Sequence, residues 1–150
     1  MARIKHIAIT TADVDATAKF YIDTMGLKEV GKVTSPNAKG YYLSDGHINL
    51  AILNFQNDQV AGVERGKDFH GIHHIGFEVD DLEEIKATLA ANGSEPREDI
   101  NAALGLHMGG DKRKMNVETK YSAPDGVIID VSETGWIGTH GEPVEIAITT

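Results

Sequence analysis

An internal repeat is the feature that most constrains what this chain can fold into. Residues 4–15 are Ile-Lys-His-Ile-Ala-Ile-Thr-Thr-Ala-Asp-Val-Asp, and residues 72–83 are Ile-His-His-Ile-Gly-Phe-Glu-Val-Asp-Asp-Leu-Glu. The two stretches match when His6 is placed on His74. A chain of 150 residues has room for one compact domain or for two half-size modules that share a core. The repeat predicts the second arrangement.

Each copy of the repeat begins as a strand and continues as a helix. Apolar residues recur at three- and four-residue steps over residues 14–25, where Gly26 ends the pattern, and over residues 82–89, which an Asn-Gly pair follows. Asp13 and Asp81 stand at the two helix starts, where a carboxylate can accept from unpaired backbone N–H groups. These features predict two helices at matching positions.

Strand-like runs separated by turn residues follow each helix. The predicted runs are Lys28–Val33, Gly40–Leu43 and His47–Asn54 in the first half, and Glu95–Asp99, Asn116–Tyr121 and Val127–Val131 in the second. Each half is thus a strand, a helix and about three strands. We expect a first module at residues 1–54, a linker at 55–70, a second module at 71–134 and a C-terminal tail at 135–150.

Side-chain alternation along the first strand of each module separates polar from apolar residues. His6 and Ala8 share one face, whereas Ile7 and Ile9 share the other, which suits packing under the helix. The second module repeats this pattern with His74 on the polar face. Polar and small residues on one face are typical of a cavity wall.

Asp130 lies inside the apolar run 127–131, where an unpaired carboxylate is costly and a cationic partner is expected. Two histidines and this carboxylate, each on a strand, can point into one concave space. Such a set leaves coordination positions open for substrate and suits divalent iron, manganese or zinc. The residues therefore predict a metal site.

Composition excludes several classes of site. The chain has no cysteine, which rules out disulfides, thiolate nucleophiles and sulfur-ligated metals. Its formal net charge of −9 argues against nucleic-acid binding. No apolar run approaches the roughly 20 residues of a membrane helix, and no secretory segment opens the sequence. We expect a cytoplasmic protein.

Three stretches together resemble a known family. They are Lys5–Ile9, Phe20–Leu27, and His74–Phe77 taken with Pro124–Asp130. Over residues 3–134 the chain resembles the vicinal oxygen chelate superfamily, which includes glyoxalase I, methylmalonyl-CoA epimerase, extradiol dioxygenases and fosfomycin-resistance transferases. The resemblance implies an α+β fold in which two βαβββ modules form a curved mixed sheet, a cup around a divalent metal. It also implies a homodimer.

The resemblance assigns three metal ligands. His6 and His74 occupy the first-strand positions of the two modules. Asp130 stands four residues after the glycine of a Pro-Asp-Gly turn, where the family usually has Glu. Because Asp is one methylene shorter, the metal is expected closer to that strand or more weakly bound.

A fourth ligand position, in the last strand of module one, departs from the family pattern. One register places Asn49 there, with His47 on the same face, and the other places Leu50. We favour Asn49, with Asn49 or His47 as a fourth ligand or a residue that supports the ligands. Neither register supplies a strong proton-transferring carboxylate, which disfavours glyoxalase-type isomerisation.

A glycine-rich basic loop over residues 100–115 has no counterpart in the first module. His107 in this loop is a candidate acid or base, and Arg113 and Lys114 are candidates to hold a substrate carboxylate or phosphate. A solvated surface loop is an equally good interpretation.

Further candidates have weaker support. Glu78 shares the face of His74 farther along the strand and is a candidate base. Tyr121, near the Pro-Asp-Gly turn, is a candidate substrate contact whose alternative role is packing. His73 has the parity of Ile75 and is expected to be structural or at the edge of the strand, and His140 is assigned to the tail.

The preferred hypothesis is a metal-dependent enzyme of glyoxalase/dioxygenase type that chelates a small oxygenated metabolite through Fe²⁺, Mn²⁺, Ni²⁺ or Zn²⁺. One alternative is a transferase that resembles the fosfomycin-resistance enzymes. Another is a metal-free binding protein that resembles the bleomycin-resistance proteins. The chain lacks an obvious potassium-binding loop, which disfavours the transferase, and it keeps the three ligands, which disfavours the binding protein.

Overall fold

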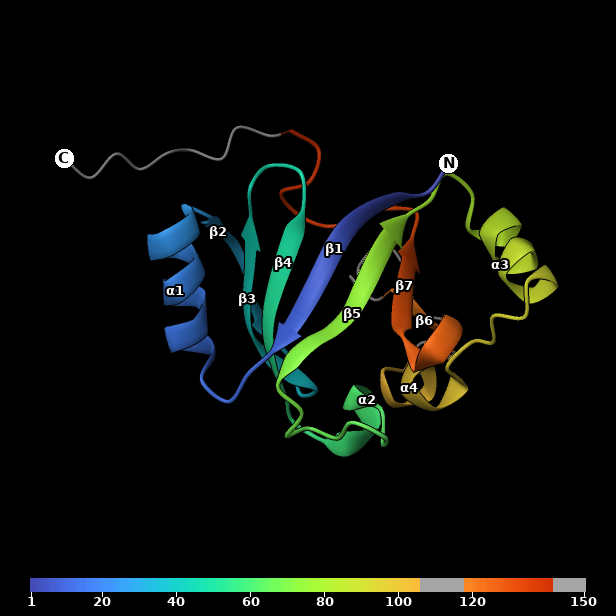
Figure 1. The fold of residues 1–150 in the computed structure, drawn as a ribbon, viewed down its shortest axis with the longest axis horizontal. Coiled ribbons are helices and arrows are strands. Elements are labelled where there is room, and N and C mark those ends of the chain that lie inside the picture. Colours follow the sequence, from blue (N-terminus) through green and yellow to red (C-terminus); the bar gives the residue numbers. More distant parts are fainter. Residues whose placement is uncertain (106–117, 142–150) are drawn as a thin grey trace.

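A computed structural model describes residues 1–105 and 118–141, whose strands form one curved sheet (Figure 1). The strands are β1 (Arg3–Thr10), β2 (Lys28–Thr34), β3 (Ala38–Ser44), β4 (Asn49–Phe55), β5 (Gly71–Glu78), β6 (Thr119–Ser122) and β7 (Ile128–Ser132). The helices are α1 (Val14–Met25), α2 (Asp58–Ala61), α3 (Leu82–Ala91) and α4 (Glu98–Ala103), with a 3₁₀ turn at Pro124–Gly126.

The strand order β2-β3-β4-β1-β5-β7-β6 confirms the prediction of two related modules in a mixed sheet. The first strands of the modules, β1 and β5, pair antiparallel at the centre. On either side, β4 runs parallel to β1 and β7 runs parallel to β5. Each module therefore brings its first and last strands next to the centre of the sheet, where the two halves meet.

The predicted helix boundaries are confirmed at both copies of the repeat. Asp13 caps α1 by accepting from the Ala16 backbone N–H, and Asp81 caps α3 in the same way from Glu84. Gly26 ends α1 with a φ of 73°, in the left-handed region that glycine adopts without strain.

The second module differs from the predicted strand–helix–three-strand pattern. The segment predicted as a strand over Glu95–Asp99 contributes only an isolated bridge between Pro96 and Tyr121, and α4 begins at Glu98. Proline has no N–H to donate to a strand ladder, and acidic residues favour a helix start. The prediction of a third strand there was wrong.

A β-bulge in β5 changes the direction of one histidine. Ala8 pairs with His74, but the next residue of β1, Ile9, pairs with Ile72, so His73 is the extra residue. Strand parity predicts His73 on the face of Ile75. Instead His73 is 1% exposed and lies against His74, because a bulge can bring two consecutive side chains to one side of a strand.

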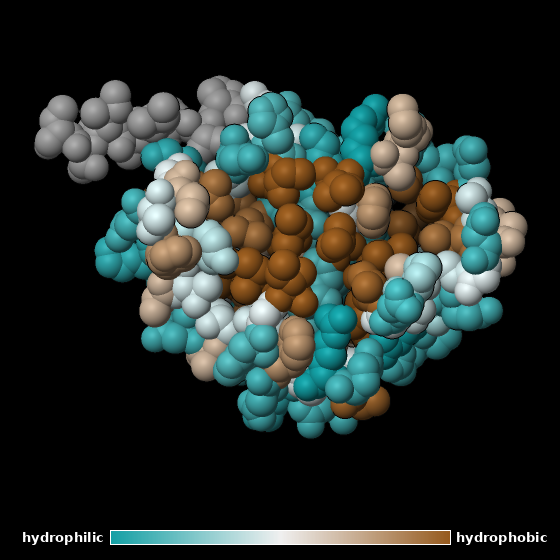
Figure 2. Space-filling model, viewed as in Figure 1, coloured by the Kyte–Doolittle hydropathy of each residue, from teal (hydrophilic) through white to brown (hydrophobic). Residues whose placement is uncertain are grey.

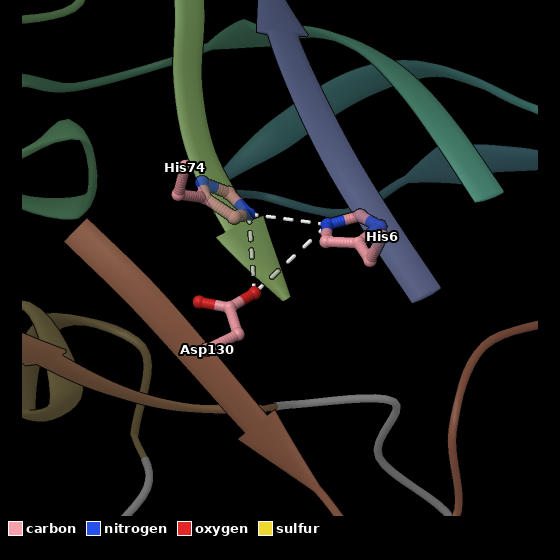
Figure 3. A group of neighbouring side chains, drawn as sticks. All are labelled: His6, His74 and Asp130. Atoms are coloured by element: carbon pink, nitrogen blue, oxygen red, sulfur yellow. Dashed lines mark hydrogen bonds and ion pairs between the residues drawn. The ribbon is translucent and has the colours of Figure 1, made fainter. Parts of the chain in front are cut away.

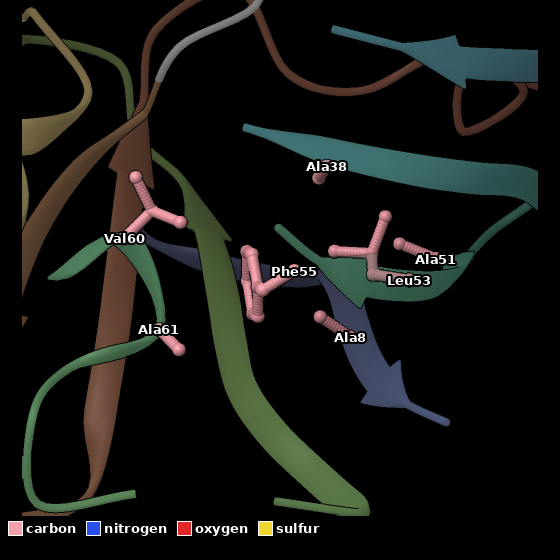
Figure 4. Packing of buried hydrophobic residues seen from close by; sticks show 7 residues of the cluster. All are labelled: Ala8, Ala38, Ala51, Leu53, Phe55, Val60 and Ala61. Carbon is pink, nitrogen blue, oxygen red and sulfur yellow. The ribbon is translucent and has the colours of Figure 1, made fainter. Parts of the chain in front are cut away.

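Small apolar residues fill the inner face of the first module next to β1 (Figure 4). The cluster consists of Ala8, Ala38, Ala51, Leu53, Phe55, Val60 and Ala61. Val60 and Ala61 belong to α2, so the segment predicted as a linker over residues 55–70 supplies part of the core. Ala8 lies on the same face of β1 as His6, and the cluster therefore supports one end of the histidine site.

On the opposite face, α1 packs on the first module through Ala18, which contacts Leu43 and Ile52. Between α1 and α3, apolar side chains gather over the central strands (Figure 2). Ile4 and Ile72 are 54% and 63% exposed there. No helix among the described ranges is long and apolar enough to cross a membrane.

Candidate metal centre

Three buried side chains from three strands converge at the centre of the sheet (Figure 3). His6 comes from β1, His74 from β5 and Asp130 from β7, and each is less than 5% exposed. His6 Nε2 lies 3.2 Å from His74 Nε2 and 3.9 Å from Asp130 Oδ2, and His74 Nε2 lies 3.1 Å from that oxygen.

The spacing of these three atoms fits one divalent ion. Ligands about 2.1 Å from a metal at tetrahedral or octahedral angles are roughly 3.0–3.4 Å apart. Two of the three separations lie in that range, and the third, from His6 to Asp130, is slightly longer. The donor set of two imidazoles and one carboxylate suits iron, manganese, nickel or zinc.

The remaining ring nitrogen of His6 is committed to Asn49, which is fully buried. The Asn49 amide donates through Nδ2 to the Ile137 carbonyl, so its Oδ1 faces His6 Nδ1 as an acceptor at 2.8 Å. His6 Nδ1 must therefore carry the proton. The Nε2 atom that faces His74 is left with a lone pair.

A second chain of hydrogen bonds fixes His74. His73 Nε2 donates to the Ala61 carbonyl at 2.6 Å, because a carbonyl can only accept. Burial lowers the pKa of His73 to about 3, so the ring is neutral and its Nδ1 is an acceptor. His74 Nδ1 donates to that atom at 2.8 Å, which leaves a lone pair on His74 Nε2.

Lone pairs on His6 Nε2, His74 Nε2 and Asp130 Oδ2 therefore point toward one another, and neither imidazole places a proton between these atoms. Burial, with the neighbouring His74, lowers the pKa of His6 to about 3, and burial also lowers the pKa of His74. Both rings are therefore neutral at neutral pH, the form that binds metal. Three electron-pair donors this close repel one another unless a cation lies between them.

Asp130 carries a buried charge with an unexpected partner. Burial alone would raise its pKa, but His74 and Lys120 outweigh burial and hold it below its usual range. Lys120 Nζ lies 2.9 Å from Oδ1, yet within residues 1–105 and 118–141 neither oxygen has a partner with the angles of a hydrogen bond. A charged carboxylate without such bonds in a buried site is consistent with a ligand oxygen.

Lys120 was not singled out from the sequence, although a signal existed. The Pro-Asp-Gly turn joins β6 to β7, and the pairing is symmetric about Asp125, which places Lys120 opposite Asp130. A hairpin centred on Asp125 therefore predicts Lys120 as the cross-strand neighbour of Asp130.

Trp136 was also missed, because the region after residue 134 was assigned to a tail. Its ring stacks on His6 with centroids 4.8 Å apart and planes 3° from parallel, and it is 3% exposed. Gly76 makes this possible, since a Cβ there would lie 2.7 Å from both the His6 Cβ and the Trp136 ring. Among the described residues, Trp136 Nε1 has no hydrogen-bond partner.

A second carboxyl, from the residue just before β6, lies near the centre. Glu118 precedes β6 and has the parity of Lys120, so both side chains point to the inner face. Burial, opposed by Lys120 and reinforced by Asp130, raises the pKa of Glu118 to about 8. A carboxyl with a pKa near the working pH can take up and release a proton. Tyr42 is within electrostatic reach, and its pKa is raised to about 12 by burial, Glu118 and Asp130.

The other predicted site residues lie elsewhere. Asn49 contacts His6 rather than the ligand atoms of the centre, whereas His47 is exposed in the turn before β4. Glu78, at the far end of β5, contacts His140 Nε2 at 2.6 Å. Tyr121 is 5% exposed on the face of β6 opposite Lys120. The candidates His107, Arg113 and Lys114 lie outside the described residues.

Comparison with known proteins finds enzymes of similar sequence. The chain is 28% identical over 120 residues to an ethylmalonyl-CoA/methylmalonyl-CoA epimerase of Cereibacter sphaeroides, which covers 71% of this chain and 83% of that protein. It is 26% identical over 140 residues to a probable chloroplastic lactoylglutathione lyase of Arabidopsis thaliana. That match covers 89% of this chain, which spans only 36% of the length of the plant protein.

Solved structures share the fold. Methylmalonyl-CoA epimerase of Streptomyces coelicolor in complex with 2-nitronate-propionyl-CoA superposes with a TM-score of 0.62 at 21% identity, over 86% of this chain and 94% of that one. A hypothetical protein from Bacillus halodurans gives 0.63 at 20% identity, over 87% and 92%. Residues 3–131 match the Glyoxalase/Bleomycin resistance protein/Dioxygenase superfamily. The chain therefore belongs to this superfamily.

Proposed function

We propose that this protein is a metal-dependent enzyme that chelates paired oxygens of a small metabolite. One observation supports this above the others: three lone-pair atoms, on His6, His74 and Asp130, converge with the other nitrogen of each ring already hydrogen-bonded. A bound Fe²⁺, Mn²⁺, Ni²⁺ or Zn²⁺ would supply Lewis-acid stabilisation of negative charge that develops on substrate oxygens.

The protein's own residues would orient the ligands and move a proton. Asn49 and His73 hold the two imidazole rings, which is the usual role of partners behind metal ligands. Glu118, just before β6, would supply the proton-transferring carboxyl that the last strand of module one lacks. Trp136 covers His6 and shields the site from water.

The presence of Glu118 supports a reaction that moves a proton at a carbon next to a carbonyl, rather than a dioxygenase reaction that inserts oxygen. An isomerase or lyase of this kind removes a proton from carbon and returns it, for which a carboxyl with a pKa near 8 is well suited. The relatives named as an epimerase and as a lactoylglutathione lyase support the same class. We therefore propose an isomerase or lyase acting on a metabolite with an acidic C–H next to a carbonyl.

Metal content is the first test. Purified protein is expected to contain, or take up on addition, about one divalent ion per chain at a three-ligand site, measured by plasma mass spectrometry. His74→Ala and Asp130→Ala should lose the ion, whereas His70→Ala, an exposed histidine outside the centre, should keep it. Wild-type protein that fails to take up any of the four ions would contradict the proposal and favour a metal-free binding protein.

Reaction class is tested by hydrogen exchange. Metal-loaded protein in D₂O, incubated with methylmalonyl-CoA or with the glutathione hemithioacetal of methylglyoxal, should incorporate deuterium at the carbon next to the carbonyl. Glu118→Gln should slow the exchange by about 10²–10⁴-fold, the usual contribution of a general acid–base group. Bound iron with oxygen consumption and no exchange would instead favour the dioxygenase.

The oligomeric state and the cellular location of the protein are also proposals. We propose a homodimer, supported by the family resemblance and by the apolar outer face over the central strands. The cytoplasmic location expected from the sequence remains a prediction.

A further inference from the structure

Lys120 is a buried lysine beside the candidate metal centre. Its side chain is 7% exposed, and its Nζ atom lies 2.9 Å from Oδ1 of the ligand Asp130. Lys120 and Asp130 are directly opposite each other on β6 and β7, so strand pairing sets their contact. A positive side chain therefore stands beside the place where a divalent cation would bind.

Lys120 and Asp130 form a buried ion pair beside the two imidazole rings, so the Asp130 carboxylate already has a cationic partner. The two carboxylate oxygens face different partners, since Oδ1 faces Lys120 and Oδ2 faces the histidines. An ion bound at Oδ2 would share a single carboxylate with the ammonium and be repelled by it.

We propose that Lys120 is an internal counter-cation, a positioning residue that neutralises Asp130 in the metal-free protein and weakens metal binding. The inference rests on the proposed function. Without a partner, the buried Asp130 charge would destabilise the metal-free fold. With metal bound, the site keeps an excess of positive charge, which suits a substrate that carries or develops negative charge on its oxygens.

The test compares metal affinity in Lys120→Met, which removes the charge at similar length, with Lys120→Arg, which keeps it. Lys19→Met, an exposed lysine paired with Asp23, is the control for loss of a positive charge. Dissociation constants for Mn²⁺ and Zn²⁺ are measured by competition with a chelating dye. Lys120→Met is expected to bind at least tenfold more tightly than wild type, whereas the other two stay within about threefold.

Thermal unfolding gives a second readout. Metal-free Lys120→Met should melt at a lower temperature than wild type, and saturating Zn²⁺ should raise its melting temperature by more than it raises that of wild type. If the metal-free variant does not fold, it is purified with metal bound, and its rate of metal loss to excess chelator should be slower than in wild type.

The outcomes separate this inference from the proposed function. Equal or weaker metal binding by Lys120→Met, with normal uptake by wild type, would overturn the counter-cation and leave the enzyme proposal intact. Metal uptake by Lys120→Met but not by wild type would support the inhibitory effect of the Lys120 charge and contradict the proposed metal-dependent function of the wild-type protein. Failure of wild type and of every variant to bind metal would contradict both the counter-cation and the proposed function.

Discussion

At the scale of single residues, the candidate centre depends on which nitrogen of each histidine carries the proton. His74 can offer Nε2 to a metal because Nδ1 donates to His73, and His73 can accept because its own Nε2 donates to Ala61. The Arg65 guanidinium contacts the His73 carbonyl and further fixes this residue. The direction of both hydrogen bonds follows from the Ala61 carbonyl, which can only accept.

This order predicts a role for His73 in metal binding that its sequence position does not suggest. His73→Phe should weaken Zn²⁺ binding by about 10–100-fold, because the His74 ring loses the acceptor that fixes its tautomer. Chelator competition measures the change, with circular dichroism to confirm folding. His70→Phe, an exposed histidine nearby in sequence, should bind as wild type. An unchanged affinity in His73→Phe would show that His73 only packs.

A prediction about packing concerns Gly76. An alanine Cβ there would meet both the His6 side chain and the stacked Trp136 ring at 2.7 Å, so Gly76→Ala should lower the free energy of unfolding by about 1–3 kcal/mol. Gly31→Ala is a milder comparison, since its nearest contact, at 3.3 Å, is a Tyr42 ring atom. Urea denaturation measures both, and a loss below about 0.5 kcal/mol at Gly76 would contradict the stacking.

At the scale of elements, the two copies of the repeat have the same helix caps but different packing. Asp13 and Asp81 each accept from a backbone N–H three residues on, at 3.0 Å. However, α1 buries Ala18 against the core, whereas α3 has no buried residue. The same local sequence signal therefore stabilises two helices that differ in their coupling to the rest of the protein.

This difference predicts two outcomes for one substitution. Asp13→Ala should lower global stability by about 1 kcal/mol in urea denaturation. Asp81→Ala should change it by less, and should instead speed amide hydrogen exchange within α3, because that helix can fray alone. The matched variants Asp13→Ser and Asp81→Ser, which keep a capping oxygen, should restore both properties. Equal global losses at the two sites would disprove the distinction.

At the scale of the whole molecule, buried ionisable groups make stability depend on pH. The pKa values of His6 and His73 fall from 6.5 to about 3 on folding, so below pH 6.5 the unfolded chain binds protons that the folded chain refuses. Stability from these groups is present above pH 6.5 and is lost as the pH falls toward 3. The pKa of Glu118 rises from 4.5 to about 8, so its contribution is lost as the pH rises from 4.5 to 8.

Metal-free protein should therefore be most stable near pH 6.5. Below that pH the lowered pKa values of His6, His73 and His74 outweigh Glu118, and the free energy of unfolding should fall by more than about 1.4 kcal/mol per pH unit down to pH 4.5. Between pH 6.5 and 8 it should fall with a similar slope because of Glu118. Urea denaturation at a series of pH values checks this. Glu118→Gln should flatten the alkaline side and make the acid side steeper, because Glu118 opposes the histidines between pH 4.5 and 6.5. A flat profile in wild type would contradict the buried charges.

The outer face predicts association. Ile4 on β1 and Ile72 on β5 are exposed, and Figure 2 shows apolar side chains over these central strands, so sedimentation equilibrium should give the mass of a dimer. Ile72→Lys should shift the protein toward monomer, because it places a charge in the apolar contact. Val63→Lys, at an equally exposed site in the turn after α2, should not. A monomeric wild type at micromolar concentration would refute the homodimer.

Sequence periodicity and the repeat predicted the two long helices with their caps and the convergence of two histidines with Asp130, whereas the mixed sheet was implied by the family resemblance. These features depend on local periodicity and on a pairing of first strands that the repeat makes visible. His6 and His74 lie side by side because equivalent strands meet at the centre of the sheet.

Tertiary structure decided what surrounds those ligands. A bulge turned His73 inward, the hairpin about Asp125 placed Lys120 on Asp130, and Trp136 folded back onto His6. The physical reason is that periodicity gives the face of a residue but not its partner. Register shifts, cross-strand neighbours and the path of a segment after the last strand depend on packing between parts of the chain that are distant in sequence.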